Sequence, residues 1–374
     1  MDQHGIPRRD VVKLLNEAGG KDLSYRGGRI LGSMCTSPNE FAKDVFSRFI
    51  ETNLGDAGLF PGTKKLEEKV ISSIAGLFGL REATGMVISG GTEANILALW
   101  AARNMTKKKK VIVPETAHFS LDKACNLLGL EIVRARVDDE KCVNVDDVEA
   151  KVDKETCAIV GVAGSTEYGT VDDIRALSKI AIDKDVYLHV DAAFGGFVLP
   201  FLKDVGYPVD FEIPENGVDS VAVDPHKMGL VPIPCGCILF RDGATMRFIE
   251  TPAPYLTQKR QHTIVGTRSG ASAASAFAVF KLLGREGYRE IVRRCMENTM
   301  ELYKGVAELG VEVRKPTINI LVFKGDEDIY NALSERGWQL SRTREGETRI
   351  VVMPHVTRGH LENFLDDLKA LAGG

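Results

Sequence analysis

Five short segments of this 374-residue chain carry groups that can bind a phosphate, transfer a proton or attack a carbonyl carbon. A Gly-Gly-Thr turn at the start of a helix offers backbone N–H groups to a phosphate, because the first amides of a helix have no partner within it. Histidine exchanges a proton near neutral pH, a buried carboxylate pairs with a cation, and a desolvated lysine is a nucleophile. In chain order the segments are Gly90-Gly91-Thr92-Glu93-Ala94-Asn95, Glu115-Thr116-Ala117-His118, Ser165-Thr166, His189-Val190-Asp191-Ala192-Ala193 and Asp224-Pro225-His226-Lys227.

Each segment lies at the carboxyl end of a short apolar run, and these runs predict buried strands. The strands are predicted at Met86–Ser89, Val111–Pro114, Cys157–Gly164, Tyr187–Asp191 and Ser220–Asp224, with further strands at Glu131–Val137 and Cys235–Arg241. Apolar residues at helical spacing separate most of them, as in Thr92–Asn104, His118–Leu128 and Asp173–Asp185. Such alternation is typical of a mainly parallel α/β sheet, here seven-stranded, with helices on both faces. Because Cys235–Arg241 follows the predicted strand Ser220–Asp224 at hairpin distance, we expect it to be antiparallel.

In open α/β sheets, ligands bind beyond the carboxyl ends of the parallel strands, so we expect the five segments to converge at one edge. Each segment alone also fits an ordinary structural role: Thr92 as a helix N-cap, His118 as a capping histidine, Lys227 as a solvated lysine. Asp191 differs, because an unpaired carboxylate at the end of an apolar strand is costly and requires a positive partner. His189, two residues earlier on the same strand face, could support Asp191.

The two ends of the chain differ from this α/β centre. Residues 1–45 show no strong strand signal and are expected to form an N-terminal arm or leading helices, ahead of a large domain over residues 46–290. Residues 291–374 are expected to form a small C-terminal α+β domain. A long helix over Ala273–Lys304 leads into it, and its predicted elements are strands at Glu312–Arg314, Asn319–Phe323 and Thr348–Met353 and helices at Ile329–Glu335 and Gly359–Leu371.

Composition argues against several classes of protein. Hydrophobic residues make up 44% and charged residues 27%, and the net charge of −4 comes with no basic surface for nucleic acid. No apolar run approaches the roughly 20 residues of a membrane helix, and the N-terminus has no signal-peptide pattern. Seven cysteines without framework spacing suit a reducing compartment, so we expect a cytoplasmic protein. Cys235-Gly236-Cys237 lacks a second pair of cysteines or histidines, so no metal site is expected.

One cofactor uses all five segments. Pyridoxal phosphate requires a lysine that forms a Schiff base with its aldehyde, and a carboxylate that keeps its pyridine nitrogen protonated. It also requires a phosphate cradle and a flat group against its ring. A Gly-Gly-Thr turn, an imidazole, a hydroxyl, a carboxylate and a lysine at one sheet edge therefore indicate a pyridoxal-phosphate enzyme.

The same segments resemble the group II pyridoxal-phosphate-dependent amino-acid decarboxylases. The matching stretches are Gly90–Asn95, His189–Ala193 with Gly195-Gly196, Asp224–Lys227 and Thr263-Ile264-Val265-Gly266-Thr267-Arg268-Ser269-Gly270. The short length and Phe60-Pro61-Gly62-Thr63 look most like the archaeal L-tyrosine/L-aspartate decarboxylase branch. The resemblance spans roughly residues 30–370 and implies a fold-type-I pyridoxal-phosphate enzyme that forms a homodimer, with its sites at the subunit interface.

The resemblance also implies a role for each matching residue. Lys227 would bond covalently to the cofactor, Asp191 would pair with the pyridinium, and His118 would stack on the ring and help control protonation. Thr166 would lie near the ring oxygen. The phosphate would be held by Gly91, Thr92 and His226, and Thr267 would reach the phosphate of the neighbouring subunit.

Two more residues complete the expected site. Arg349 matches a C-terminal arginine that several relatives use for a substrate carboxylate. Tyr255 lies where relatives carry a mobile loop with a proton-donating tyrosine, although the loop here is short and rich in proline. The implied reaction is decarboxylation of L-aspartate to β-alanine, of L-tyrosine to tyramine, or of both, for coenzyme A or methanofuran synthesis. The low aromatic content of 7% favours aspartate.

Two other functions are compatible with the motifs. A carbon–carbon lyase of the sphingosine-phosphate-lyase type shares the Thr263–Gly270 stretch and would bind substrates that bear a phosphate. A non-catalytic binding protein with this fold would need neither Lys227 nor Asp191, so the presence of both argues against it. An absorbance spectrum together with an assay of carbon dioxide release separates the three functions.

Overall fold

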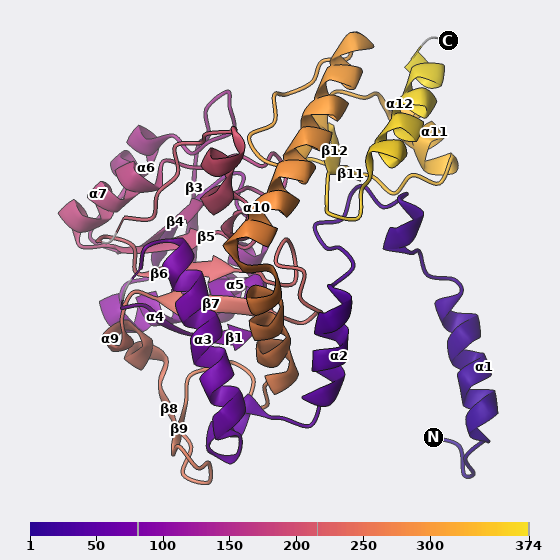
Figure 1. The fold of residues 1–374 in the computed structure, drawn as a ribbon. Coiled ribbons are helices and arrows are strands. Elements are labelled where there is room, and N and C mark those ends of the chain that lie inside the picture. Colours follow the sequence, from indigo (N-terminus) through magenta and orange to yellow (C-terminus); the bar gives the residue numbers. More distant parts are fainter. Residues whose placement is uncertain (81, 215, 373–374) are drawn as a thin grey trace.

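A seven-stranded sheet forms the centre of the molecule (Figure 1), in a computed structural model that describes residues 1–80, 82–214 and 216–372. The strands are β1 (Thr84–Ile88), β2 (Lys110–Pro114), β3 (Glu131–Ala135), β4 (Thr156–Val162), β5 (Tyr187–Asp191), β6 (Ser220–Val223) and β7 (Gly236–Phe240). Their order is β1-β7-β6-β5-β4-β2-β3. Strand β7 pairs antiparallel with β1 and β6, and the other pairs are parallel. This confirms the predicted mainly parallel sheet and its antiparallel strand.

Helices cover both faces of this sheet. They are α3 (Pro61–Leu77), α4 (Gly91–Thr106), α5 (Ser120–Leu128), α6 (Val145–Lys151), α7 (Ile174–Lys184) and the first half of α10 (Gly270–Glu308). Val111 and Val113 of β2 pack with α4 and α5, whereas Ile112 between them packs with the cluster that includes α3 and α7. Successive strand residues therefore point to opposite faces that are both buried, which explains the uninterrupted apolar runs.

The C-terminal part forms a small α+β unit around a three-stranded antiparallel sheet. Its elements are β10 (Ile320–Phe323), β11 (Ser341–Arg342), β12 (Thr348–Val351), α11 (Glu327–Glu335) and α12 (Arg358–Ala372). Trp338 and Phe364 meet edge to face in its core, and Leu302 from the second half of α10 joins them. A separate hydrophobic core thus supports this unit, as the sequence predicts.

The structure corrects one predicted strand and the bounds of several other elements. The strand predicted at Glu312–Arg314 is wrong, because Val313 makes only an isolated bridge to β10. Pro316 has no N–H and cannot extend that pairing. The helix predicted over His118–Leu128 begins two residues later, at Ser120, since the histidine ring accepts the Ser120 backbone N–H (3.2 Å) and stays in the loop. Helices α3 and α6 were not predicted from the sequence.

One long helix joins the large and small parts of the molecule. The backbone of α10 bends at Gly284, where φ is 56°, a conformation that favours glycine. Its first half packs against α3 and α2 (Glu40–Arg48), and its second half contacts α12. The division expected between residues 290 and 291 falls within this helix.

The N-terminal helix α1 (Arg8–Gly19) stands apart from the rest of the chain in Figure 1. No residue of α1 is buried. Val11, Leu14 and Leu15 share one of its faces and are 40%, 57% and 65% exposed. The arm expected over residues 1–45 thus includes a helix with an apolar face that nothing covers within the described chain. None of the helices in the described ranges combines the length and hydrophobicity needed to cross a membrane.

Candidate active site

A cavity of about 390 Å³ opens at the carboxyl ends of the central strands. The five segments singled out from the sequence converge here, as the topology of an open α/β sheet predicts. Seven of the ten predicted site residues line the cavity, namely Gly91, Thr92, His118, Thr166, Asp191, His226 and Lys227. Tyr255, Thr267 and Arg349 do not line it.

Lys227 extends its amine into this cavity beside a carboxylate. Its Nζ lies 3.0 Å from Asp224 Oδ2, and Asp224 is 2% exposed. Burial alone would lower the pKa of Lys227, but the carboxylates of Asp224 and Asp191 outweigh burial and hold that pKa above its ordinary value. The ion pair therefore positions a charged amine in the cavity, and this amine must lose a proton before it can attack a carbonyl carbon.

Asp191 ends β5 with its carboxylate 7% exposed. One oxygen accepts a hydrogen bond from the Nδ2 of Asn95 (2.9 Å) and the other accepts one from the backbone N–H of Ala193 (3.1 Å). The positive partner expected from the sequence is not found within ion-pair distance among the described residues. A buried carboxylate with only neutral donors favours a cation supplied by a ligand.

Asn95 is the residue that sequence reasoning missed, since it was considered only as part of a helix start. It is 0% exposed, and its Oδ1 meets His189 Nε2 at 2.8 Å. His189 Nδ1 in turn meets Ser220 Oγ at 2.8 Å. Its place one helical turn after Gly91 was the available signal, because that spacing turns Asn95 toward the same edge of the sheet. His189 therefore supports Asp191 indirectly, through Asn95.

The N-terminus of α4 faces the cavity, at the place where the sequence predicts a phosphate cradle. Gly90 is the N-cap and no side chain caps this end, so the alternative of Thr92 as the N-cap is wrong. A Cβ on Gly91 would lie 3.0 Å from Ala193 Cβ and 3.1 Å from Asp224 Oδ2, a spacing that only glycine accepts readily. The first amides of this 16-residue helix therefore remain available to an anionic group.

Two histidines, His226 and His118, also line the cavity. The Nδ1–H of His226 donates to the carbonyl of Cys235 (2.7 Å), which leaves Nε2 on the side of Asp224 at 3.7 Å. His118 Nδ1 meets Ser120 Oγ at 2.8 Å. Burial lowers the pKa of His118, so its ring is mainly neutral at pH 7.

Arg349 of β12 lies next to the cavity and is 7% exposed. Its guanidinium donates to the carbonyls of Thr166 and Gly32 (the latter at 2.7 Å) and to Ser341 Oγ (2.8 Å). No carboxylate of the described residues lies within ion-pair distance of it. Burial lowers the pKa of Arg349, and the charge of Glu167 opposes that effect. A buried guanidinium bonded only to neutral acceptors leaves its charge available to an anion.

Tyr255 and Thr267 lie outside this cavity in the single chain. Tyr255 is 86% exposed in the turn between β8 (Thr251–Pro252) and β9 (Arg260–Gln261), which extends from the body of the molecule in Figure 1. Thr267 is exposed and lines a separate cavity of about 110 Å³, beside Glu93. The roles predicted for both residues involve a moved loop or a second subunit, and they stay predictions.

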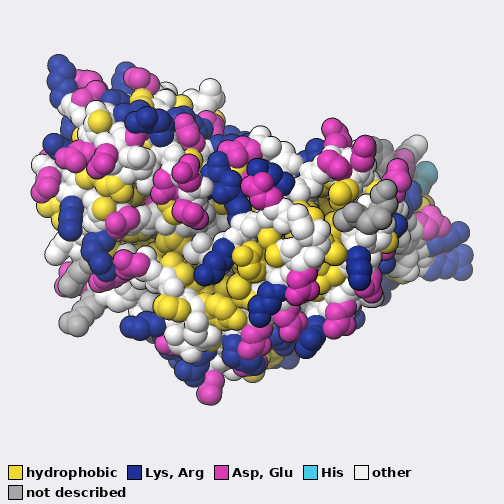
Figure 2. Space-filling model, turned by 90° about the horizontal axis from the view of Figure 1, so that it is seen from above, with side chains coloured by type: hydrophobic (Ala, Val, Ile, Leu, Met, Phe, Trp, Pro, Cys, Tyr) yellow, Lys and Arg dark blue, Asp and Glu magenta, His cyan; other side chains and the backbone are white. Residues whose placement is uncertain are grey.

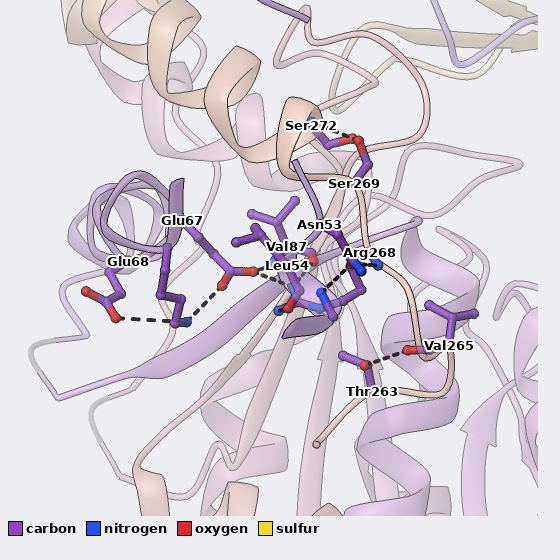
Figure 3. Close-up of polar contacts among 12 residues, drawn as sticks. Asn53, Leu54, Glu67, Glu68, Val87, Thr263, Val265, Arg268, Ser269 and Ser272 are labelled. Carbon is purple, nitrogen blue, oxygen red and sulfur yellow. Dashed lines mark hydrogen bonds and ion pairs between the residues drawn. The ribbon is translucent and has the colours of Figure 1, made fainter. Parts of the chain in front are cut away.

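The Thr263–Gly270 stretch that carries Thr267 is held to the sheet by Arg268 (Figure 3). Arg268 donates to the carbonyls of Val87 (2.7 Å) and Leu54 (3.0 Å) and pairs with Glu67, which is 0% exposed. Burial raises the pKa of Glu67, but Arg268 and Lys64 outweigh it and hold the pKa below its ordinary value. This ion pair fixes the stretch beside β1, whose carboxyl end leads into the N-terminus of α4.

Comparison with known proteins places this geometry in a family. The pyridoxal-dependent decarboxylase conserved domain matches residues 33–324. The chain is 46% identical to a probable L-tyrosine/L-aspartate decarboxylase of Methanothermobacter thermautotrophicus, over 93% of this chain and 99% of that protein. It is also 46% identical to an L-aspartate decarboxylase of Thermococcus kodakarensis, over 99% of this chain and 98% of that protein. An L-aspartate/L-glutamate decarboxylase of Pyrococcus horikoshii is 47% identical to this chain, over 98% of this chain and 97% of that protein.

Solved structures agree on the fold. The sphingosine-1-phosphate lyase of Burkholderia pseudomallei superposes with a TM-score of 0.92 at 28% identity, over 100% of this chain and 92% of that one. The glutamate decarboxylase of Lactobacillus brevis superposes with a TM-score of 0.90 at 24% identity, over 100% of this chain and 93% of that one. With a lysine, a buried carboxylate and the uncapped end of α4 in one cavity, these matches show that the chain belongs to the pyridoxal-dependent decarboxylase family and is an amino-acid decarboxylase that uses pyridoxal phosphate.

Proposed function

We propose that this enzyme decarboxylates L-aspartate to β-alanine, with L-tyrosine as a second candidate substrate. The observation that carries the choice of aspartate is Arg349, a buried guanidinium beside the cavity without a carboxylate partner among the described residues. A planar guanidinium suits a second substrate carboxylate, which aspartate has and tyrosine lacks. The names of several relatives, which include aspartate alone or aspartate with tyrosine, support both candidates. We further propose a cytoplasmic role that supplies β-alanine for coenzyme A or tyramine for methanofuran.

The residues of the cavity fit the cofactor. When bound, pyridoxal phosphate would supply an aldehyde for the substrate amine and a protonated ring that stabilises the electron pair left on the α-carbon when carbon dioxide departs. We assign Lys227 to the covalent bond with the cofactor and Asp191 to the proton on the ring nitrogen, since its carboxylate has only neutral donors within the described chain. The phosphate ligands are assigned to the uncapped end of α4 and its neighbour, that is to Gly91, Thr92 and His226.

Two residues of the lining have assigned roles around the ring. His118 lies in the loop before α5 and is assigned to the ring face, where its neutral imidazole can pack flat. Thr166 is assigned to the ring oxygen. Loss of carbon dioxide leaves an electron pair on the substrate α-carbon, and one proton must be added there to balance the reaction. We assign this proton to His118 or to Tyr255, and Tyr255 would require its exposed turn to move.

We also propose that two copies of the chain form the active enzyme, with Thr267 of each copy near the phosphate of the other. Figure 2 shows hydrophobic side chains gathered in a broad band across one face of the single chain. Extended exposed apolar surface favours association. Ile264 and Val265, in the stretch that carries Thr267, are also exposed and apolar, and so is Leu59. Sedimentation of the cofactor-loaded protein at twice the chain mass of 40.9 kDa would support the dimer, and a monomer would contradict it.

A carbon–carbon lyase is the second candidate function, because the lyase of Burkholderia pseudomallei superposes with a TM-score of 0.92. A panel of L-amino acids tested for carbon dioxide release, beside a phosphorylated long-chain amino alcohol tested for cleavage, separates the two. We expect carbon dioxide and β-alanine from L-aspartate. From L-tyrosine, the second candidate substrate, we expect carbon dioxide and tyramine. Cleavage of the amino alcohol without any release of carbon dioxide would overturn the proposal.

A further inference from the structure

Asn95 joins two groups of the cavity that belong to different elements of the fold. Asp191 ends β5, whereas His118 lies in the loop before α5, and Asn95 of α4 lies between them. We propose that Asn95 is a positioning residue: it orients the Asp191 carboxylate and, through Ser120, places the proton of the neutral His118 ring on Nε2. This inference rests on the proposed roles of Asp191 and His118 toward the cofactor.

The orientation of the Asn95 amide follows from the chemistry of its partners. A carboxylate only accepts hydrogen bonds, so the group 2.9 Å from Asp191 Oδ2 must be the NH₂ of Asn95. The second hydrogen of that NH₂ points to Ser120 Oγ at 2.8 Å. Both amide hydrogens are then used, and Oδ1 remains as the acceptor that faces His189 Nε2 at 2.8 Å.

The first branch of this network fixes the proton of His189. Because Asn95 Oδ1 is an acceptor, Nε2 of His189 must carry the hydrogen. Burial lowers the pKa of His189 to about 4, so the ring is neutral at pH 7 and its Nδ1 is an acceptor. Nδ1 accepts the hydroxyl hydrogen of Ser220 (2.8 Å). All polar atoms of this branch are therefore paired, as a buried network requires.

The second branch fixes the proton of His118. Ser120 is 0% exposed, and its Oγ accepts from Asn95 and donates its own hydrogen to His118 Nδ1 (2.8 Å). The backbone N–H of Ser120 points to the same nitrogen (3.2 Å). Nδ1 of His118 is thus an acceptor, and the ring proton is on Nε2. An imidazole with this proton on Nε2 is a hydrogen-bond donor at that atom.

The test reads histidine protonation directly, with the cofactor-free protein labelled with ¹⁵N at histidine. Two-bond ¹H–¹⁵N correlation spectra at pH 7, assigned with His118→Gln and His189→Gln, should show both rings with the proton on Nε2. Ser120→Ala breaks only the second branch, so it should shift Nδ1 of His118 toward the position of a nitrogen without a hydrogen bond and leave His189 unchanged. Asn95→Leu removes the acceptor of His189 and should shift its Nε2 resonance. Asn104→Leu, at a half-buried asparagine of α4 that donates to the Phe248 carbonyl (2.7 Å), is the matched control.

The same variants are then loaded with pyridoxal phosphate. Loss of a hydrogen bond to a charged group predicts that Asn95→Leu weakens cofactor binding or lowers kcat/KM by roughly 10- to 100-fold, with the control unchanged. A wild-type ring protonated on Nδ1, or Asn95→Leu with unshifted spectra or with wild-type affinity and turnover, would overturn the inference. The spectra of the cofactor-free protein do not depend on the substrate, so a wild-type enzyme that ignores every amino acid would count against the proposed function alone.

Discussion

The cavity floor and two exposed segments, the Tyr255 turn and α1, differ in how much of their structure one chain provides. At the floor, Asp191, Asn95 and His189 are buried, and each polar group described for them has a partner from the same chain. In the exposed segments, Tyr255 is 86% exposed and α1 has no buried residue. The floor is thus prepared for a cofactor by one chain, whereas the exposed segments are expected to reach their working structure only against a second copy. Substitutions in the two regions should therefore fail in different ways.

The largest effect should come from the floor at Lys227. Lys227→Ala removes the amine that bonds to the cofactor, and we expect kcat to fall on the order of 10⁴-fold or more. Borohydride treatment of the cofactor-loaded wild type should attach the cofactor to Lys227, as shown by peptide mapping. A label on a different lysine would refute the assignment.

Asp191→Asn should follow, because it keeps the shape of the floor and removes the charge that holds the proton on the ring nitrogen. We expect pyridoxal phosphate still to bind, while kcat falls roughly 10³-fold, equivalent to about 4 kcal/mol. Titration of the variant with cofactor separates binding from turnover. Near-normal turnover would contradict the assigned role of this carboxylate.

Arg349 lies beside the cavity, and its substitution separates the two substrates. If its guanidinium binds the side-chain carboxylate, Arg349→Met should lower kcat/KM for L-aspartate roughly 100-fold and change that for L-tyrosine little. Equal losses for both amino acids would instead indicate that Arg349 binds the α-carboxylate or orders the small domain through its bonds to Thr166 and Gly32. A wild-type enzyme indifferent to aspartate would overturn the preference itself.

The smallest effect on the fold of one chain should come from the exposed helix α1. Leu14→Asp together with Leu15→Asp charges the exposed apolar face without breaking a contact within the chain, so unfolding of the single chain should change little. If a second copy covers this face, sedimentation should show a dimer dissociation constant raised roughly 10-fold, by the loss of buried apolar area. Lys13→Asp, on the opposite face of α1, is the control and should leave the dimer intact. An unchanged dimer in the double variant would show that α1 lies outside the interface.

Sequence reasoning predicted the floor well because its signals are local. One apolar strand ends at Asp191, and three others end within four residues before Gly90, His118 and Lys227. The rule that ligands bind at the carboxyl ends of parallel strands brings these residues together. The role of Asn95 was not predicted, since it depends on how the helix it belongs to rotates against β5. A strand was wrongly expected at Glu312–Arg314, where local β propensity was not matched by a complete partner strand. Tertiary packing decides such cases.

The pairing of Glu67 with Arg268 was also beyond sequence reasoning, because 201 positions separate the two residues. This separation has a consequence for synthesis of the chain on the ribosome. Until Arg268 has emerged, Glu67 has no guanidinium to offset its burial, and Leu54 and Val87 lack a donor for their carbonyls. The large domain is therefore expected to consolidate only after most of the chain has been made, as is usual where closing contacts join distant segments. Nascent chains halted before residue 268 should accordingly be the form of this protein most dependent on chaperones and most readily cut by proteases.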